Sequence, residues 1–319
     1  MFSQYLNGMS TVFMLHRVSP PENQRLPLNE RLKVSPDFLE QFIKTAKKKD
    51  YSFISLETLY DALIQGKSMT KTLVLTLDDG YADNYVEAFP IFKKYEIPFT
   101  IYITTSFPDS TAILWWYTLE DVILENTTLT LSDGTQFDCS TFEKKVQAFS
   151  DIRQRLIHLP NQDFLNGLNA LFAPKIIDWQ AKVKELALSW DQIAEISEHP
   201  LATIGAHTIN HFALAELTEE GVKREVMGCK EIIESHIHRP VEHFCYPFGG
   251  PKEVGIRDFE LVKRLGFKTA TTTRYGSIFA EHKEHLTALP RVMFDHEFSL
   301  LKYELNAIRR CFKGRVVTV

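Results

Sequence analysis

Three short segments of the chain combine residues that could bind a metal ion or move a proton. They are Asp78-Asp79-Gly80, the segment His-Thr-Ile-Asn-His from His207 to His211, and Tyr246-Pro247-Phe248-Gly249. Each follows a short apolar run that predicts a β-strand. The first run, Leu73 to Leu77, is almost continuously apolar, which is typical of a parallel strand covered on both faces. Because the carboxyl ends of parallel strands carry the chemistry of α/β folds, we expect the three segments to share one rim.

The two histidines and the acidic pair favour a metal site together more than either does alone. His207 and His211 are four residues apart, so one helical or turn-like revolution could place both rings against one ion. An isolated pair of this spacing is weak evidence, but this one follows a strand-like run that ends in small residues. Asp78 and Asp79 could form an ordinary turn, yet adjacent carboxylates repel each other unless a cation compensates. The combination predicts a site for one divalent metal ion.

Strand-like runs alternate with stretches of helical periodicity along most of the chain. The runs span residues 11–16, 51–55, 73–77, 99–104, 202–206, 242–246, 268–273 and 289–294. This alternation predicts an α/β fold, a distorted (β/α) barrel of seven or eight parallel strands. The helices have recognisable starts: Ser35 can cap one, and Pro36 suits its first turn. Thr218 begins another in the same way.

The interval from about 107 to 189 is too long for one connection between a strand and a helix. We interpret it as an insertion of several helices within a single domain spanning 1–319, because no linker, repeat or low-complexity segment divides the chain. Trp115 begins a stripe of apolar residues at helical spacing that we expect to face a core, with a surface on which a sugar stacks as the alternative. Trp116 and Tyr117 fall off that stripe, and they are the candidates in this interval for contact with a ligand.

Composition and charge exclude several classes of partner. The net charge of −5, with scattered Lys and Arg, provides no basic surface for a nucleic acid. No stretch approaches the roughly 20 apolar residues of a membrane span, and Met1 to Asn7 lack the pattern of a secretory signal. We therefore expect a cytoplasmic protein without a membrane span. The four cysteines are far apart, so neither a disulfide framework nor a thiolate zinc site is predicted.

The motifs and their order resemble those of the polysaccharide deacetylases of the NodB-homology type, carbohydrate esterase family four. Thr76-Leu77-Asp78-Asp79-Gly80 is similar to the family's T-F-D-D-G motif, and the segment from His207 to His211 is similar to its H-[ST]-x-x-H motif. The resemblance implies that Asp78 is the catalytic base. It also implies that Asp79, His207 and His211 are the metal ligands. The residues from Phe13 to Val18 and from Leu188 to Ile193 resemble a branch found with surface-polysaccharide genes.

Two positions depart from the family pattern. Pro247-Phe248 matches the end of the family's R-x-P-Y motif, but Cys245 stands where an arginine would orient the base. Arg291, at the end of the last predicted strand, is the candidate replacement, with an ordinary surface arginine as the alternative. The family's L-x-H motif, which supplies a general acid, has no clear counterpart. The candidates for the acid are His16, His243 and His296, the last within an expected helix, and each could instead be a packing residue.

The chemistry that such a site could perform follows from its ligand set. Two neutral imidazoles and one carboxylate leave a divalent cation with open positions for water and a carbonyl oxygen. Zn²⁺ is the first expectation for these ligands, and Fe²⁺ or Co²⁺ would also suit them. Asp78 would accept a proton as water attacks an acetamide carbon, and a backbone N–H between Tyr246 and Gly249 would stabilise the oxyanion.

The resemblance implies a metal-dependent hydrolase that removes the N-acetyl group of an amino sugar in a surface polysaccharide or its precursor and releases acetate. An N-acetylated sugar or glycan is then the expected partner. A non-catalytic protein for glycan binding or assembly is an alternative, because the arginine and the acid histidine are missing. An O-acetyl esterase or a hydrolase of another amide is a second alternative. A magnesium phosphatase is disfavoured, since it would leave both histidines unused. The sugar, its linkage and the oligomeric state are not specified by the sequence.

Overall fold

The computed structural model describes residues 8–159, 164–311 and 317–319. Its main sheet contains β1 (Ser10–Leu15), β4 (Ser52–Phe53), β5 (Thr72–Leu77), β6 (Phe99–Ile103), β9 (Ala202–Ala206), β10 (His243–Cys245), β11 (Thr269–Tyr275) and β12 (Leu289–Met293). Parallel strands pair in the order β1-β12-β11-β10-β9-β6-β5, and β5 pairs again with β1. Within the described residues, seven strands therefore close a barrel, and β4 pairs with the start of β5. The predicted barrel is confirmed, and all eight predicted runs contribute strands to its sheet.

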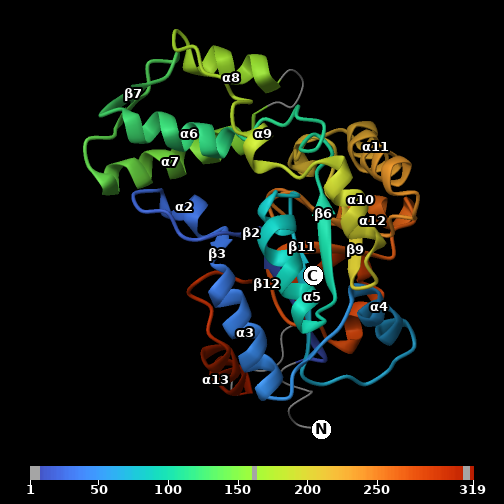
Figure 1. Ribbon diagram of the computed structural model, residues 1–319. Helices are drawn as coiled ribbons and strands as arrows, with labels where there is room; N and C mark the ends of the chain where they lie inside the picture. The colour runs from blue at the N-terminus through green and yellow to red at the C-terminus, as the bar shows by residue number, and fades with distance from the viewer. Residues whose placement is uncertain (1–7, 160–163, 312–316) are drawn as a thin grey trace.

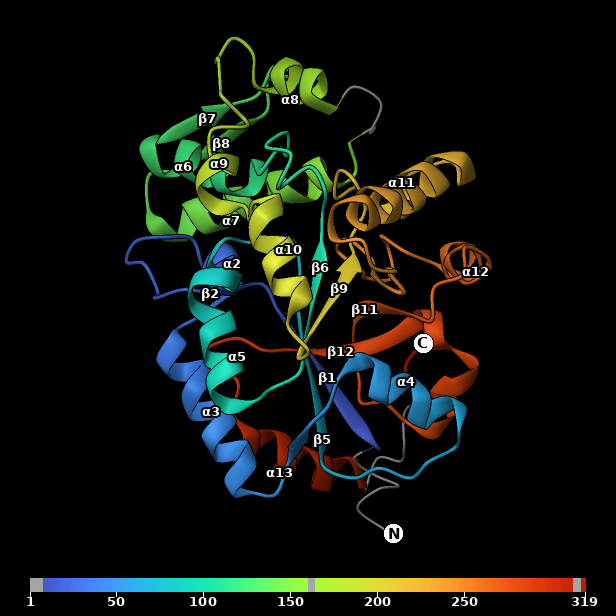
Figure 2. The ribbon, with the colours of Figure 1, turned by 45° about the vertical axis from the view of Figure 1, so that its right-hand side comes forward.

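Helices connect the strands and surround the barrel (Figure 1; Figure 2). They are α2 (Pro27–Glu30), α3 (Pro36–Lys48), α4 (Leu56–Ile64), the π-helix η1 (Asn84–Ala88), α5 (Phe89–Tyr95), α10 (Trp190–Glu198), α11 (Glu219–Ile237), α12 (Ile256–Arg264) and α13 (Leu300–Cys311), with short 3-10 turns η2 (Leu214–Glu216), η3 (Ala280–Glu284) and η4 (Leu286–Ala288). The predicted caps are present: the side chain of Ser35 accepts a hydrogen bond from the Phe38 N–H, and that of Thr218 accepts one from the Gly221 N–H. A small parallel pair, β2 (Arg17–Val18) and β3 (Lys33–Val34), follows β1.

The interior of the barrel has its own packed cluster. Val12 of β1, Tyr102 of β6, Cys245 of β10 and Leu289 of β12 belong to one group of buried side chains. These strands are not all neighbours in the sheet, so their side chains meet only inside the barrel. Because successive side chains of a strand point to opposite faces, Arg291 shares the inward face of β12 with Leu289. The last strand thereby directs an arginine into the barrel.

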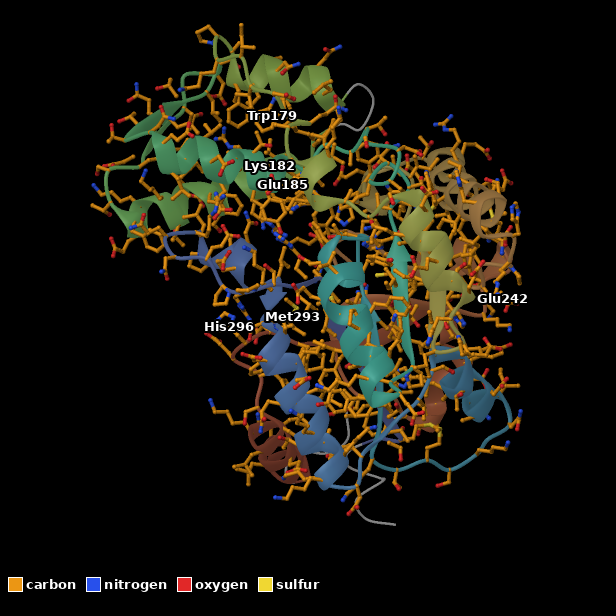
Figure 3. The ribbon with its side chains drawn as sticks, viewed as in Figure 1. Trp179, Lys182, Glu185, Glu242, Met293 and His296 are labelled. Atoms are coloured by element: carbon orange, nitrogen blue, oxygen red, sulfur yellow. The ribbon has the colours of Figure 1, made fainter. Side chains whose placement is uncertain are left out.

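An insertion between β6 and α10 stands over the rim toward which the strands point (Figure 1). We keep the name insertion for residues 107–189. It contains α6 (Trp115–Glu125), α7 (Phe142–Ile157), α8 (Phe164–Phe172), α9 (Val183–Leu186) and the antiparallel hairpin of β7 (Thr128–Thr130) and β8 (Gln136–Asp138). The hairpin escapes prediction because strands of three residues are too short for alternation to be recognisable. Figure 3 shows Trp179 within the insertion, where it is 1% exposed in a separate apolar cluster.

The described part of the chain contains no helix with the length and apolarity that a membrane crossing requires. The segment Met1 to Asn7, which entered the prediction of location, lies outside the described residues. Cys139, Cys229 and Cys245 are buried free thiols, whereas the side chain of Cys311 lies outside the described part.

Candidate active site

The acidic pair lies at the carboxyl end of β5, where the chain turns sharply. Asp79 and Gly80 both have left-handed backbone angles, with φ of 75° and 93°. A Cβ atom at Gly80 would stand 3.1 Å from the Cδ1 atom of Ile103, so a larger residue would be both strained and crowded there. This turn separates the two carboxylates, and Asp78 and Asp79 therefore meet different neighbours.

Asp79 faces both histidines of the second segment. Its Oδ1 atom lies 3.3 Å from Nε2 of His207 and 3.2 Å from Nε2 of His211. One candidate ligand atom from each of the three residues lies within 4.8 Å of the others, which is compatible with one ion. A second close group, Asp78 with His207 and Cys245, is less suitable, because Asp78 already pairs with an arginine.

The tautomer of His207 supports a cation at this point. Its Nδ1 atom is 2.7 Å from the carbonyl oxygen of Cys245. A carbonyl can only accept, so Nδ1 carries the proton and the neutral ring presents the lone pair of Nε2 to the Asp79 carboxylate. Two acceptors that face each other at 3.3 Å need a proton or a metal ion between them. The three residues therefore fit a divalent cation.

The same geometry explains the titration of these groups. Burial disfavours the charged forms, but it is outweighed: the His211 and His207 rings hold the pKa of Asp79 well below its ordinary value. For His207, burial is outweighed by the fields of Cys245 and Asp79, and its pKa lies well above the usual value. In the absence of a cation, a proton takes its place, so metal binding would compete with protons.

The loop that carries the histidines is held by residues outside the motif. The hydroxyl of Thr208 accepts a hydrogen bond from the His211 N–H at 2.9 Å. Glu225 of α11 accepts hydrogen bonds from the backbone N–H groups of Ile209 and Asn210, at 3.0 and 2.9 Å. Both Thr208 and His211 have positive φ, so the loop is a turn and not a helix. Glu225 was missed by sequence reasoning, because a glutamate on an amphipathic helix gives no signal of its own.

Arg291 binds the other carboxylate of the pair with both ends of its guanidinium. Nη1 donates to Oδ1 of Asp78 and Nη2 to Oδ2, each at 2.7 Å. Nη2 also lies 3.1 Å from Sγ of Cys245, and Nη1 donates to the hydroxyl of Thr76 at 3.0 Å. Arg291 is 1% exposed and is not a surface residue. Burial would raise the pKa of Asp78, but the guanidinium outweighs burial and lowers it.

His16 lies beside the same carboxylate, just beyond β1. Its Nε2 atom is 3.9 Å from Oδ2 of Asp78. Burial lowers the pKa of His16 despite the nearby carboxylates of Asp79 and Asp78. Asn84, the first residue of η1, donates a hydrogen bond to the His16 carbonyl at 2.8 Å. Asn84 follows the acidic pair by five residues in sequence, yet it has no motif by which it could have been found.

The structure does not bring the other two candidate histidines to this rim. His243 lies at the start of β10, where its ring hydrogen-bonds Thr269 at 2.8 Å and Glu57 at 3.1 Å. As the first residue of β10, His243 lies at the amino end of the strand, away from the carboxyl end that carries the site. His296 is exposed in a turn after β12, and not in the expected helix. Figure 3 shows it at the edge of the molecule beside β3 and α3.

The third segment contributes less than its four residues suggested. The Tyr246 N–H donates to the Thr271 carbonyl and the Gly249 N–H to the Pro247 carbonyl, so both are already used. Pro247 has no N–H group. Within the described residues the Phe248 N–H makes no hydrogen bond, and the Phe248 ring lies 4.8 Å from that of His211. The expected backbone donor is thereby narrowed from the whole segment to Phe248.

A cavity of about 270 Å³ opens over these residues. Its lining includes His16, Asp78, Asp79, His207, His211 and Phe248 of the barrel, Trp115, Trp116 and Arg153 of the insertion, and Leu28, Asn29 and Leu32 at α2. The Trp116 ring is 5.4 Å from that of His211, and its N–H donates to the Tyr81 hydroxyl. Trp115 lines the cavity too and also belongs to the apolar cluster of the insertion, so its side chain takes part in both a core and the cavity wall. The Tyr117 hydroxyl instead lies 3.5 Å from Arg17.

Comparison with known proteins places this geometry among related barrels. A family model described as polysaccharide deacetylase matches residues 65–270. The Bacillus subtilis (strain 168) protein YxkH, whose name assigns it to the polysaccharide deacetylases, is 21% identical over 282 residues, which is 88% of this chain and 70% of YxkH.

Several solved structures share the fold. The Streptococcus pyogenes deacetylase PplD, determined in complex with acetate, has a TM-score of 0.61 and 19% identity over 93% of this chain and 96% of its own. BC0361, a polysaccharide deacetylase from Bacillus cereus, has a TM-score of 0.59 and 20% identity over 94% and 68% of the two chains. IcaB from Ammonifex degensii has a TM-score of 0.57 and 16% identity over 95% and 98%. At these identities the likeness concerns the fold alone.

Proposed function

The chain belongs to the polysaccharide deacetylase family, and from this premise we propose that it hydrolyses the N-acetyl group of an amino sugar in a metal-dependent reaction that releases acetate. The proposal rests on one observation: the two adjacent carboxylates have different partners. Asp78 is held by Arg291 at 2.7 Å, whereas Asp79 faces His207 and His211. An acidic turn with a purely structural role would not require that its two carboxylates have these separate partners.

Asp79, His207 and His211 would hold the metal ion. When bound, a divalent cation polarises a carbonyl oxygen and lowers the pKa of water, which is the activation that amide hydrolysis requires. We propose Zn²⁺ as the resident ion on the basis of the His, His, Asp ligand set, with Fe²⁺ and Co²⁺ as the alternatives. Metal content of the purified protein, with reconstitution by each ion after chelation, would distinguish them.

The remaining side chains would move and hold the protons. Asp78 is the general base: its low pKa, maintained by Arg291, keeps it ionised and ready to accept the proton of the attacking water. The Phe248 N–H would donate to the oxyanion that develops on the acetyl carbonyl. The leaving amine then needs a proton, which Asp78 can return directly or pass through His16, 3.9 Å away.

The walls of the cavity support a sugar substrate. Trp116 and Phe248 present aromatic rings beside His211, and the apolar face of a pyranose packs well on such rings. We propose that the amino sugar belongs to a surface polysaccharide or its precursor. A precursor, or a glycan under assembly, accords with the cytoplasmic location that we also propose. The free thiols of Cys139, Cys229 and Cys245 suit a reducing compartment.

The geometry of the site also bears on the two alternative functions, a non-catalytic glycan-binding protein and an O-acetyl esterase. The non-catalytic alternative was motivated by a missing arginine and a missing acid histidine. The first motive is weakened because Arg291 binds the carboxylate that the arginine should orient. Hydrolysis of an O-acetyl ester would use the same groups, but it would not require protonation of an amine. The relative rates on matched ester and amide substrates would therefore separate the two activities.

The decisive experiment measures acetate release from N-acetylated amino sugars by the metal-loaded protein and by Asp78→Asn. We expect the substitution to lower kcat by roughly 10²–10⁴-fold, the usual contribution of a general base. Asp138→Asn is the matched control, because Asp138 is an exposed residue of β8 that pairs with Lys144 and is not among the residues that line the cavity. Equal acetate release by the wild type and Asp78→Asn would refute the proposal.

A further inference from the structure

Arg153 brings a positive charge from the insertion into the cavity above the metal ligands. It lies on α7, and it lines the same cavity as Asp78, His207 and His211. Its guanidinium carbon is 5.9 Å from the centre of the Phe248 ring, so it lies over the side chain of the residue whose backbone N–H is the proposed oxyanion donor. The insertion thus contributes an ionised side chain to the proposed reaction site as well as apolar walls.

Apart from the Phe248 ring, this guanidinium has no partner in the part of the chain that the structure describes. Within the described residues, Arg153 makes neither an ion pair nor a side-chain hydrogen bond, and it is only partly exposed. Burial lowers its pKa, and the nearest opposing influence, Glu253, acts at a distance longer than an ion pair. Arginine nevertheless stays charged in proteins. A partly buried cation without a counterion is unfavourable unless another molecule supplies one.

Two other polar side chains of the cavity wall, those of Asn29 and Thr273, are already engaged in hydrogen bonds. The amide of Asn29 donates to the Trp116 carbonyl and to Glu120. The hydroxyl of Thr273 donates to the Phe248 carbonyl at 2.6 Å. Arg153 is the one arginine or lysine of the described lining, and none of its N–H groups donates to an acceptor among the described residues. Its flat, five-donor fork matches carboxylate and phosphate oxygens in a bidentate manner.

We propose that Arg153 binds an anionic substituent, a phosphate or a carboxylate, carried by the amino sugar whose acetamide is hydrolysed. The inference rests on the proposed function, and it narrows the substrate class from neutral N-acetyl sugars to acidic ones. The cavity of about 270 Å³ is slightly smaller than the range of roughly 300–1,000 Å³ that is usual for ligand sites, which suits one sugar with one substituent. Arg153 is a specificity residue in this role and not a catalytic one.

The kinetic test compares three substrates that share the acetamide: methyl N-acetylglucosaminide, which is neutral, N-acetylglucosamine 1-phosphate and N-acetylmuramic acid. We expect the wild type to prefer one of the two acidic sugars. Arg153→Gln should lower kcat/KM for that sugar by about tenfold or more, mainly through KM, and change the neutral sugar less than about twofold. Arg153→Lys should recover part of the loss, because it keeps the charge but not the fork.

Arg155→Gln is the matched control. Arg155 lies two residues further along α7, is exposed, and pairs with Asp133 at 3.1 Å, so its loss should leave all three rates unchanged. Thermal unfolding of both variants shows whether either disturbs the fold. Equal losses on neutral and acidic sugars would mean that Arg153 only packs on Phe248, and that result would overturn the inference. Unchanged rates would overturn it too.

A binding measurement separates this inference from the proposed function. Glucose 1-phosphate, glucuronic acid and methyl glucoside carry no acetamide, so their affinities can be measured by calorimetry without turnover. We expect the wild type to bind one of the two acids at least about tenfold more tightly than the neutral glucoside, and Arg153→Gln to lose that preference. If no N-acetyl sugar releases acetate but the preference is present, the proposed reaction fails while the anion site stands. Equal affinity for all three overturns the anion site.

Discussion

The two ends of the barrel use similar residues for different purposes. At the carboxyl rim, Asp78 and Arg291 have side chains that are 3% and 0% exposed. At the amino ends of β10 and β11, Lys268 pairs with Glu57 and Glu242, whose side chains are each 39% exposed. Figure 3 shows Glu242 at the margin of the molecule on the side of α4. The residue types are alike, and burial distinguishes them.

The difference between the two ends shows that a ligand site can be recognised by buried polar groups whose interactions are not satisfied within the protein. At the amino ends of β10 and β11, Lys268, Glu57 and Glu242 have opposite partners and access to water, so each of these pairs contributes little to stability. At the carboxyl rim, acceptors face acceptors where His207 meets Asp79, and no carboxylate among the described residues forms an ion pair with the Arg153 guanidinium. Buried groups with unmet requirements persist where a ligand or ion fulfils them. The contrast can be tested by substitutions at both ends.

The largest effect is expected for His211→Ala. Loss of one of three metal ligands should reduce the bound divalent metal to trace amounts and lower acetate release by about 10³-fold or more. Elemental analysis and an acetate assay check the two results together. His158→Ala is the control, because His158 is a partly exposed partner of Glu216 outside the site. Full metal content in His211→Ala would show that His211 is not a metal ligand.

The second largest effect is expected for Arg291→Gln, because it leaves the Asp78 carboxylate buried without its partner. Breaking a buried ion pair from one side costs roughly 3–5 kcal/mol, measurable as a lower free energy of unfolding in urea. Arg155→Gln should cost less than about 1 kcal/mol, since Arg155 and Asp133 are 43% and 50% exposed in their pair. Similar losses in the two variants would contradict the distinction between a buried and an exposed pair.

The same variant has a pH signature. In the wild type, burial raises the pKa of Asp78 but Arg291 outweighs it, so the pKa lies below the ordinary value. Without the guanidinium, burial dominates and the pKa rises. The acid limb of the rate–pH profile should therefore move to higher pH in Arg291→Gln, and by less in Arg291→Lys. An unmoved limb would mean that Asp78 is not the group that titrates.

A smaller effect is expected for Cys245→Ala. The Arg291 guanidinium keeps its two hydrogen bonds to Asp78, and those to Thr76 and to the Thr272 carbonyl, when the contact with Sγ is lost. We expect kcat to change by less than about threefold and stability by about 1 kcal/mol, the scale of one modest polar contact. Cys245→Ser tests whether the volume or the sulfur matters. A collapse of activity in both variants would give Cys245 a role beyond this contact.

The smallest effect is expected for Glu57→Gln at the opposite end. The hydrogen bond from His243, followed by that from Lys268, lowers the pKa of Glu57 to about 2. A lowered pKa stabilises the fold above the ordinary value of 4.5, and this contribution is lost as pH falls toward about 2. Solvent screening should limit it to less than about 1 kcal/mol. The urea midpoints of the wild type and Glu57→Gln, measured at pH 6 and at pH 3, test this prediction. A difference between the two proteins that is larger at pH 3 than at pH 6 would contradict it.

Local patterns in the sequence were sufficient for most of the barrel. The strand-like runs, the caps at Ser35 and Thr218, and the expected insertion depend on residues close together in the chain. The hairpin of β7 and β8 was missed because its strands are too short to show a period, and the turn at His296 because no breaker residue marks it. Glu225, Asn84 and Arg153 were missed as well, since each acts on a segment that is distant in sequence or only brought near by the fold.

The sequence by itself determined which residues follow each strand, and therefore that Asp78, Asp79, His207 and His211 share one rim. Only the tertiary structure decided which partner each of those side chains has. Arg291 is separated from Asp78 by 213 positions, and it reaches the carboxylate because closure of the barrel brings β12 beside β1 while alternation turns the side chain inward. Arg153 reaches the cavity because the insertion folds back over the rim. Such pairings depend on barrel closure and burial, which have no local pattern in the sequence.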